Sequence, residues 1–112
     1  MTTLMTHKTI GCVESATKIL GDKWTPVLLR AIHNNDSVRF CQLQDNVGGI
    51  NPRTLTARLN HLEEQGIITR CADDSTRREC YRMSEKGEAL MPILRSMAQW
   101  GREFPSITER VA

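Results

Sequence analysis

Side chains able to recognise nucleic-acid bases are concentrated in the segment 51–66. Arginine can donate two hydrogen bonds to the major-groove edge of guanine, which makes Arg53 the first candidate for a base contact. Thr54 and Ala57 are small, so a helix carrying them could bring its backbone close to a groove. This segment therefore predicts a helix that reads duplex DNA. The side chains expected to meet base edges are Asn51, Arg53, Thr54 and Ala57.

The ends of this segment carry the signals of a helix. Asn51 can accept hydrogen bonds from the free amide groups of the first turn, and Pro52 suits the first helical position. Gly66 can adopt the left-handed conformation that ends many helices. The side opposite the polar face is apolar, which predicts a stripe facing a core. Its members are Leu55, Leu59 and Leu62.

Two short apolar runs follow this helix and predict a β-hairpin. Residues 67–72 and 79–83 have the composition of strands, and the polar segment 73–78 predicts a turn between them. Arg77 and Arg78 would project from this wing toward phosphates or a narrow minor groove, where the negative potential favours guanidinium groups. An ordinary solvated hairpin tip is the alternative, since runs of charge are most often solvated.

Three further basic residues are expected to contact the DNA backbone. Residues 41–47 predict a short helix that forms a helix-turn-helix with the segment 51–66. Arg39 precedes this pair, within a brief strand predicted at 38–40. Lys23 and Arg58 complete the set. Such contacts would position the protein on the duplex without reading its sequence.

The remaining elements are predicted to be helices. Residues 12–20 carry apolar residues at helical spacing up to Gly21, and residues 27–32 predict a second helix that is deeply buried. Ser84 can cap a helix after the wing, and Gly87 is expected to be a tolerated weak point there. The fold class predicted is mainly α with a small β-hairpin (α+β).

Apolar stripes near both ends of the chain predict a homodimer. From Leu90 to Trp100 apolar residues recur three and four apart, and so small a domain offers them no obvious partner. This helix and the helix at 12–20 would form an interface if they packed across a two-fold axis. The alternative is that both helices cover their own core, as apolar stripes most often do.

Length and composition limit the number of domains and the classes of function that the chain could have. The chain has 112 residues, of which 39% are hydrophobic, so one domain spanning 1–112 is expected. The net charge of +2 is too small for a non-specific nucleic-acid coat, so DNA binding would depend on local basic clusters. The lack of a secretory signal and of a bilayer-spanning apolar run predicts a cytoplasmic protein that does not enter membranes. The order of histidines, cysteines and carboxylates predicts no metal site, no cofactor and no enzyme.

Four cysteines are spread along the chain without a Cys-x-x-Cys pair, which argues against a zinc ribbon. A reducing cytoplasm predicts that all four are thiols. Cys71 and Cys80 would approach each other across the hairpin, yet reduced packing is expected there as well. The other two are Cys12 and Cys41.

Several motifs resemble the HxlR family of bacterial regulators, and they occur in order from about Cys12 to Phe104. The combination of Gly21-Asp22-Lys23-Trp24 with a terminal Trp100-Gly101 is far more specific than a generic helix-turn-helix pattern. The other matching segments are Cys12-Val13-Glu14, Arg39-Phe40, Leu55-Thr56-Ala57-Arg58-Leu59, Leu62-Glu63-Glu64-Gln65-Gly66 and Ser84-Glu85-Lys86-Gly87.

The resemblance implies a dimeric winged-helix transcription factor, related in architecture to MarR-type proteins, that usually represses and sometimes activates neighbouring genes. It implies no enzymatic activity. By position the recognition helix of the family falls on residues 51–65 and its wing on 73–78, in agreement with the residue pattern. Pro52 and Thr54 replace the longer polar residues expected there, so the operator cannot be taken from a relative.

Some members of this family sense electrophiles or oxidants through a cysteine near the N-terminus, and the resemblance places Cys12 at that position. A helix beginning near Cys12 would stabilise its thiolate, Lys8 would add to this effect, and Glu14 would oppose it. A buried, unreactive Cys12 is the alternative. The expected effector is an electrophile, an oxidant or another small-molecule inducer.

The sequence therefore predicts a winged helix-turn-helix domain with dimerisation helices at its N- and C-terminal ends. It would bind a pseudo-palindromic operator in double-stranded DNA as a homodimer, act as a repressor and respond to thiol oxidation through Cys12. The competing hypothesis is a winged-helix module for protein assembly, in which the helix 51–66 docks on a partner protein. Salt distinguishes the two, because DNA binding releases counterions and weakens steeply as salt is added.

Overall fold

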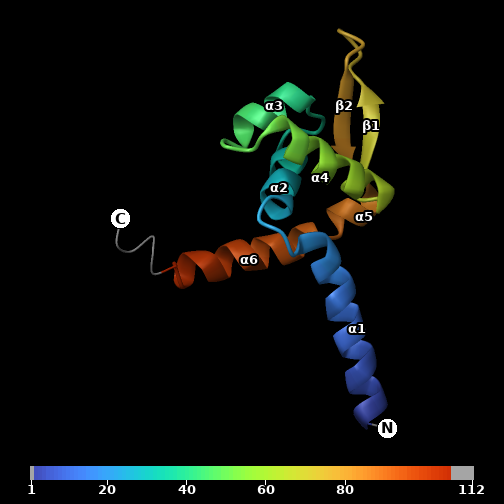
Figure 1. Ribbon diagram of the computed structural model, residues 1–112, viewed down its shortest axis with the longest axis vertical. Coiled ribbons are helices and arrows are strands. Elements are labelled where there is room, and N and C mark those ends of the chain that lie inside the picture. Colours follow the sequence, from blue (N-terminus) through green and yellow to red (C-terminus); the bar gives the residue numbers. More distant parts are fainter. Residues whose placement is uncertain (1, 107–112) are drawn as a thin grey trace.

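Helices make up most of the structure, and one antiparallel hairpin follows the fourth of them (Figure 1). The computed structural model describes the backbone of residues 2–106 and the side chains of residues 11–106. It confirms the predicted class, mainly α with a small β-hairpin in a winged helix-turn-helix. The elements are α1 (Thr2–Leu20), α2 (Thr25–Asn34), α3 (Phe40–Asn46), α4 (Pro52–Glu64), β1 (Ile68–Ala72), β2 (Glu79–Met83), α5 (Glu85–Glu88) and α6 (Met91–Glu103).

The first helix is longer than the sequence predicted. α1 begins at Thr2 and runs for 19 residues, whereas apolar spacing predicted a start near Cys12. Apolar spacing marks only the part of a helix that faces a core, and most of α1 projects away from the other elements (Figure 1). Because Cys12 lies well inside α1, the prediction that a helix N-terminus stabilises its thiolate is wrong.

The second helix lies at the centre of the core. Leu28 and Ile32 of α2 are fully buried, as the sequence predicted for this element. Asp22 organises the start of the helix, since its carboxylate accepts hydrogen bonds from the amide groups of Trp24 and Thr25 at 2.8 and 2.9 Å. These bonds satisfy two donors that the first turn of a helix leaves free.

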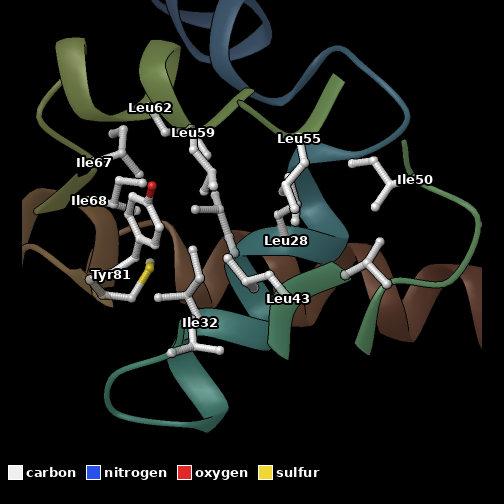
Figure 2. Packing of buried hydrophobic residues seen from close by; sticks show 14 of the residues in the cluster. Leu28, Ile32, Leu43, Ile50, Leu55, Leu59, Leu62, Ile67, Ile68 and Tyr81 are labelled. Atoms are coloured by element: carbon white, nitrogen blue, oxygen red, sulfur yellow. The ribbon is translucent and has the colours of Figure 1, made fainter. Parts of the chain in front are cut away.

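Buried side chains from the helices and the hairpin form one hydrophobic cluster. Figure 2 shows Leu28 of α2 beneath Leu55 and Leu59 of α4, and Tyr81 of β2 lies at one side of the cluster. The apolar stripe predicted for the segment 51–66 is thereby confirmed as the buried face of α4. The cluster consists of Leu28, Leu29, Ile32, Val38, Leu43, Val47, Ile50, Leu55, Leu59, Leu62, Ile67, Ile68, Tyr81, Met83, Met91 and Leu94.

The hairpin is attached to the segment before α3 through one bridge. The Val38 amide donates to the Tyr81 carbonyl at 3.0 Å, and the Tyr81 amide donates to the Val38 carbonyl at 2.7 Å. The sequence predicted a brief strand at 38–40, but α3 already begins at Phe40, so within that segment Val38 alone pairs with the hairpin. The predicted third strand is thus a one-residue bridge beside a two-stranded sheet.

The helix after the wing packs against Ile67 with no room for a side chain at Gly87. Ser84 caps this helix as predicted, because its hydroxyl oxygen accepts from the Gly87 amide at 3.0 Å. A Cβ on Gly87 would lie well under 3.0 Å from the carbonyl oxygen of Ile67 and 3.0 Å from Cε of Met83. Gly87 is therefore required for this approach, and the expectation that it is a tolerated weak point is wrong.

The two terminal helices extend away from the rest of the molecule. Figure 1 shows α1 and α6 leaving the group formed by α2 to α5 in different directions, with the wing at the end opposite α1. The molecule measures 55 × 40 × 24 Å along its principal axes. A helix in such a position can bury only part of its apolar face against its own chain.

Candidate nucleic-acid interface

The proposed reading helix has the two ends that the sequence predicted. Oδ1 of Asn51 accepts a hydrogen bond from the Thr54 amide at 2.8 Å, and Pro52 occupies the first helical position. Gly66, just beyond the helix, has a φ of 73°, in the left-handed region that glycine enters most readily. These local features fix the ends of α4 and hence which of its residues face away from the core.

The face of α4 opposite its leucines is open to solvent. Arg53, Ala57 and Asn60 are exposed on this face, and Thr54 lies half-buried at its edge. Within the described part of the chain, Arg53 has no ion-pair partner, so its guanidinium is available for a ligand. Asn51 is exposed too, but its Oδ1 is engaged by the cap, which leaves its NH₂ group to donate. This face can present hydrogen-bond donors to base edges.

The wing ends in two exposed arginines. Neither Arg77 nor Arg78 has an ion-pair partner among residues 11–106. The Arg77 amide donates to the Asp73 carbonyl at 2.7 Å, and the Asp73 amide donates to the Arg78 carbonyl at 2.8 Å. Arg77 has a φ of 59°, a left-handed conformation that costs a non-glycine residue roughly 1–2 kcal/mol. The turn therefore holds the predicted basic tip in a defined and strained conformation.

Asp73 organises the turn and lies near a second expected DNA contact. Its carboxylate accepts hydrogen bonds from the Ser75 hydroxyl at 2.7 Å, the Ser75 amide at 2.9 Å and the Thr76 amide at 3.2 Å. These bonds, and to a smaller extent the charge of Arg39, hold the pKa of Asp73 below its ordinary value. The guanidinium of Arg39 is therefore close enough to the wing turn to interact electrostatically with Asp73.

The other expected phosphate contacts have partners within the chain. Nη1 of Arg58 lies 3.6 Å from Oδ2 of Asp22, and Nζ of Lys23 lies 4.8 Å from the centre of the Trp24 ring. Partial burial alone would raise the pKa of Asp22, but hydrogen bonds from Thr25 and Trp24 and the charge of Arg58 lower it overall. Arg58 therefore shares its charge with Asp22, whereas the exposed Lys23 keeps its ammonium group accessible.

Arg70 connects the reading helix to the wing, and sequence reasoning missed it. Its Nε donates to both carboxylate oxygens of Glu63, at 2.9 and 3.0 Å, and its Nη1 donates to Glu79. Its Nη2 donates to Oδ1 of Asn60 at 3.2 Å, and its guanidinium carbon lies 5.6 Å from the centre of the Tyr81 ring. The bonds to Glu63, and next those to Glu79, raise the pKa of Arg70 above its ordinary value. The opposite charges were visible in the sequence, but their pairing depends on how β1 lies against α4.

The cysteines differ from the expectation of four thiols. Cys71 and Cys80 are joined by a disulfide across the hairpin, because the strand register places them directly opposite each other with Cα atoms 4.9 Å apart. Cys12 and Cys41 are free and exposed, so the alternative of a buried Cys12 is wrong. The side chain of Lys8, expected to support a Cys12 thiolate, lies outside the described residues.

Apolar side chains remain exposed on the first, second and last long helices. On α6, Leu94 is buried against the core, whereas Ile93 and Met97 are 45% and 46% exposed. Only part of the stripe predicted between Leu90 and Trp100 therefore packs on its own chain. An open pocket of about 660 Å³ lies between α2 and α6. Among residues 11–106, the exposed large apolar residues are Val13, Val27, Ile93, Met97, Trp100 and Phe104.

Neither a membrane-spanning helix nor a metal-binding cluster is present among the described residues. No helix there has both the length and the apolar character needed to cross a membrane. In the same part of the chain, no group of three or more His, Cys, Asp or Glu residues is arranged to hold a metal ion.

Comparisons with known sequences agree with the helix-turn-helix seen here. The model of the HxlR-like helix-turn-helix family matches residues 19–109. An uncharacterised HTH-type transcriptional regulator of Methanothermobacter thermautotrophicus is 32% identical over 98 residues, which cover 87% of this chain and 74% of the relative. The HTH-type transcriptional regulator YodB of Bacillus subtilis is 27% identical over 93 residues, which cover 82% of each chain.

Solved structures share the fold as well. The redox regulator HypR in its reduced form has a TM-score of 0.77 and 28% identity, and the match covers 88% of this chain and 97% of HypR. The reduced form of YodB from B. subtilis has a TM-score of 0.72 and 28% identity, over 83% of this chain and 91% of YodB. Together with the family match over most of the chain, these likenesses show that this protein is a helix-turn-helix transcriptional regulator that belongs to the HxlR family.

Proposed function

We propose that this regulator recognises a specific duplex site by placing α4 in the major groove and the wing along the DNA backbone. The observation that carries this proposal is the exposed guanidinium of Arg53, which has no ion-pair partner among residues 11–106, on a helix whose opposite side is fixed in the core. Arg53 would pair with guanine, and Asn51, Thr54 and Ala57 would accompany it at base edges. The backbone contacts would come from Lys23, Arg39, Arg58, Arg77 and Arg78.

The conformation of Arg77 supports a binding role for the wing tip. Glycine would hold a φ of 59° at a lower cost than arginine. An arginine kept in this conformation reduces the stability of the turn, which is expected where the side chain serves binding rather than folding. The exposed guanidinium of Arg78 beside it gives the tip two positive charges.

We also infer that the protein works as a homodimer that represses transcription. The exposed apolar residues on α1 and α6, such as Val13, Met97 and Trp100, would be buried if two copies packed these helices across a two-fold axis. Two reading helices would then contact the two halves of a pseudo-palindromic operator. A dimer bound at a promoter would exclude the transcription machinery, so repression is the expected outcome.

The regulator is further proposed to consist of one domain over 1–112, to act by binding rather than catalysis, and to work in the cytoplasm on the DNA it reads. The continuous hydrophobic cluster supports a single domain. The relatives named as transcriptional regulators support a role without catalysis.

The proposed signal is a thiol-reactive compound that acts on Cys12. HypR is named a redox regulator and has been solved in reduced and oxidised forms, and YodB has been solved after diamide treatment and with bound quinone. In this chain Cys12 is a free, exposed thiol on α1, the helix assigned to the dimer interface. Modification of Cys12 by an oxidant or an electrophile such as a quinone would therefore act on the dimer and on operator affinity.

Selection of bound duplexes from a random pool tests this function. Reduced protein should enrich a two-fold symmetric site, and oxidant should abolish the enrichment. Cys12→Ser should keep the enrichment in the presence of oxidant, whereas Cys41→Ser, at the other free exposed thiol, should still lose it. A symmetric site that survives oxidation would keep the regulator and remove Cys12 as its sensor.

Salt dependence separates DNA reading from protein assembly. Each phosphate contact adds about 0.9 to the slope of log affinity against log salt, so the backbone contacts proposed here predict a steep slope. An interface that is mostly apolar at its centre would show little salt dependence. No enrichment of duplex DNA at any salt concentration would favour the assembly module over the DNA-binding regulator.

A further inference from the structure

The two cysteines of the wing lie at a boundary within the hairpin. Toward the helices, the next residue on β2 is Tyr81, which pairs with Val38 through two hydrogen bonds. Toward the tip, one more strand pair, Ala72 with Glu79, precedes the turn that carries the arginines. The Cys71–Cys80 pair therefore lies between the base of the wing, which is bonded to Val38, and the distal wing, which projects from the domain.

We propose that Cys71 and Cys80 form a thiol–disulfide exchange site that controls the wing, distinct from the sensing role proposed for Cys12. In the oxidised form the disulfide holds the distal wing in the observed conformation. In the reduced form the distal wing is held less tightly, and its arginines lose their fixed placement. This inference rests on the proposed DNA contacts of Arg77 and Arg78. It identifies the cysteine pair as the site that regulates those contacts.

The two sulfurs differ in solvent exposure, and this difference determines which cysteine reacts first with an oxidant. Cys71 is half-buried, whereas Cys80 is 2% exposed. The oxidant is a disulfide of a low-molecular-weight thiol, RSSR. The Cys71 thiolate attacks one sulfur of RSSR, a mixed disulfide forms, and RS⁻ leaves. The Cys80 thiolate then attacks Sγ of Cys71, the protein disulfide forms, and the second RS⁻ leaves. The two cysteine protons end on two RSH, so the protein loses two electrons and RSSR gains them.

The charges around the pair favour this exchange. Successive side chains along a strand alternate between its faces, so Arg82 lies on the same face as Cys80 and is a diagonal neighbour of Cys71. A nearby guanidinium stabilises a thiolate, which is the reactive form. Asp73 would have the opposite effect, but the Ser75 and Thr76 groups already bond its carboxylate in the turn. Glu79 bonds Arg70, whose side chain lies on the other face of the hairpin.

Opening the disulfide would loosen the tip more than the base. The base stays attached through the Val38–Tyr81 bridge and through the bonds from Arg70 to Glu63. The segment beyond the pair keeps the Arg70–Glu79 bond and the hydrogen bonds of the turn. The Arg70–Glu79 bond is solvent-exposed and the turn bonds are local, so the interactions of this outer segment open far more readily than a covalent bond. The expected result is a reduced form that still reads bases through α4 but binds the DNA backbone less tightly.

The test uses the chain with Cys12→Ser and Cys41→Ser, which leaves the wing pair as its only thiols. The protein is equilibrated in buffers with different ratios of glutathione to glutathione disulfide. Thiol labelling with mass spectrometry gives the oxidised fraction, and fluorescence anisotropy gives the affinity for the selected duplex at several salt concentrations. Loss of two phosphate contacts from each of the two wings of the proposed dimer lowers the log–log salt slope by roughly 3.6, so the affinity advantage of the oxidised form should shrink roughly 150-fold between about 50 and 200 mM salt.

Two further variants, made in the same background, complete the experiment. Cys71→Val with Cys80→Val keeps residues suited to a strand at the paired positions but cannot be oxidised, so its affinity should not respond to the buffer. Arg77→Ala with Arg78→Ala should still form the disulfide, but its affinity should no longer depend on it. These variants separate the redox chemistry of the wing from the DNA contacts that it is proposed to control.

Each outcome decides one claim. Equal affinities and salt slopes for the oxidised and reduced forms would overturn control of the wing and leave the proposed DNA-binding function standing. A pair that stays reduced in every glutathione buffer would overturn the exchange site itself. Failure of both forms to bind any duplex would instead refute the proposed function, and control of DNA binding by the wing would fail with it.

Discussion

Replacing Gly87 by alanine tests the tight contact between α5 and the start of the wing. The added Cβ would meet the Ile67 carbonyl oxygen well under 3.0 Å away, the Ile67 carbonyl carbon at 3.2 Å and Met83 Cε at 3.0 Å. The Met83 side chain can move, but the Ile67 carbonyl belongs to the backbone, so α5 has to shift. Overpacking of this kind costs about 1–3 kcal/mol, while alanine returns about 1 kcal/mol of helix propensity. We expect the free energy of unfolding to fall by up to about 2 kcal/mol.

Gly101→Ala is the matched control for this substitution. Gly101 lies in α6, and a Cβ there would meet nothing within 4 Å. The control should therefore gain roughly 0.5–1 kcal/mol from helix propensity alone. Urea denaturation of both variants and the parent, at one protein concentration, gives the comparison. If Gly87→Ala were as stable as Gly101→Ala, the claim that α5 can approach Ile67 only with glycine would be wrong.

Four other predictions follow from the site and the surface. Arg53→Ala should relax operator preference at one base pair per half-site, by roughly 1–3 kcal/mol in a binding assay with substituted duplexes, whereas Arg95→Ala on α6 should leave it unchanged. Arg77→Gly should be more stable than Arg77→Ala by roughly 1 kcal/mol, because glycine relieves the left-handed strain, and both should lose the same DNA affinity. The lowered pKa of Asp22 stabilises the fold above its unfolded-state value near 3.9, and this contribution is lost as pH falls through the folded pKa, so Asp22→Asn should be less stable than the parent at pH 7 and the gap should close in acid. Met97→Glu should convert the proposed dimer to monomers in light scattering, and an unchanged mass would remove α6 from the interface.

Features set by neighbouring residues were predictable from the sequence. The ends of α4 follow from Asn51, Pro52 and Gly66, whose conformational preferences act within one turn, and the structure confirms all three. The buried stripe of α4 was predictable for the same reason, since helical spacing alone places its leucines on one side.

Features set by distant residues were not predictable in this way. The bonds of Arg70 to Glu63 and Glu79 require β1 to lie against α4, and the space at Gly87 depends on Ile67, twenty positions earlier. The Cys71–Cys80 disulfide was predicted wrongly because the expectation relied on the cellular compartment rather than on strand register. The base and phosphate contacts remain predictions, because they involve a partner molecule rather than this chain.

The link formed by Arg70 has a consequence for the DNA. Since its guanidinium bonds side chains of both α4 and β2, the base of the wing and the reading helix are linked rather than independently placed. If α4 and the wing contact DNA as proposed, the protein sets the distance between the groove contact and the backbone contact, and the duplex has to adopt a shape that matches this distance. Bending and groove narrowing cost less in some sequences than in others. Operator choice would therefore depend on the flexibility of base pairs that no side chain touches.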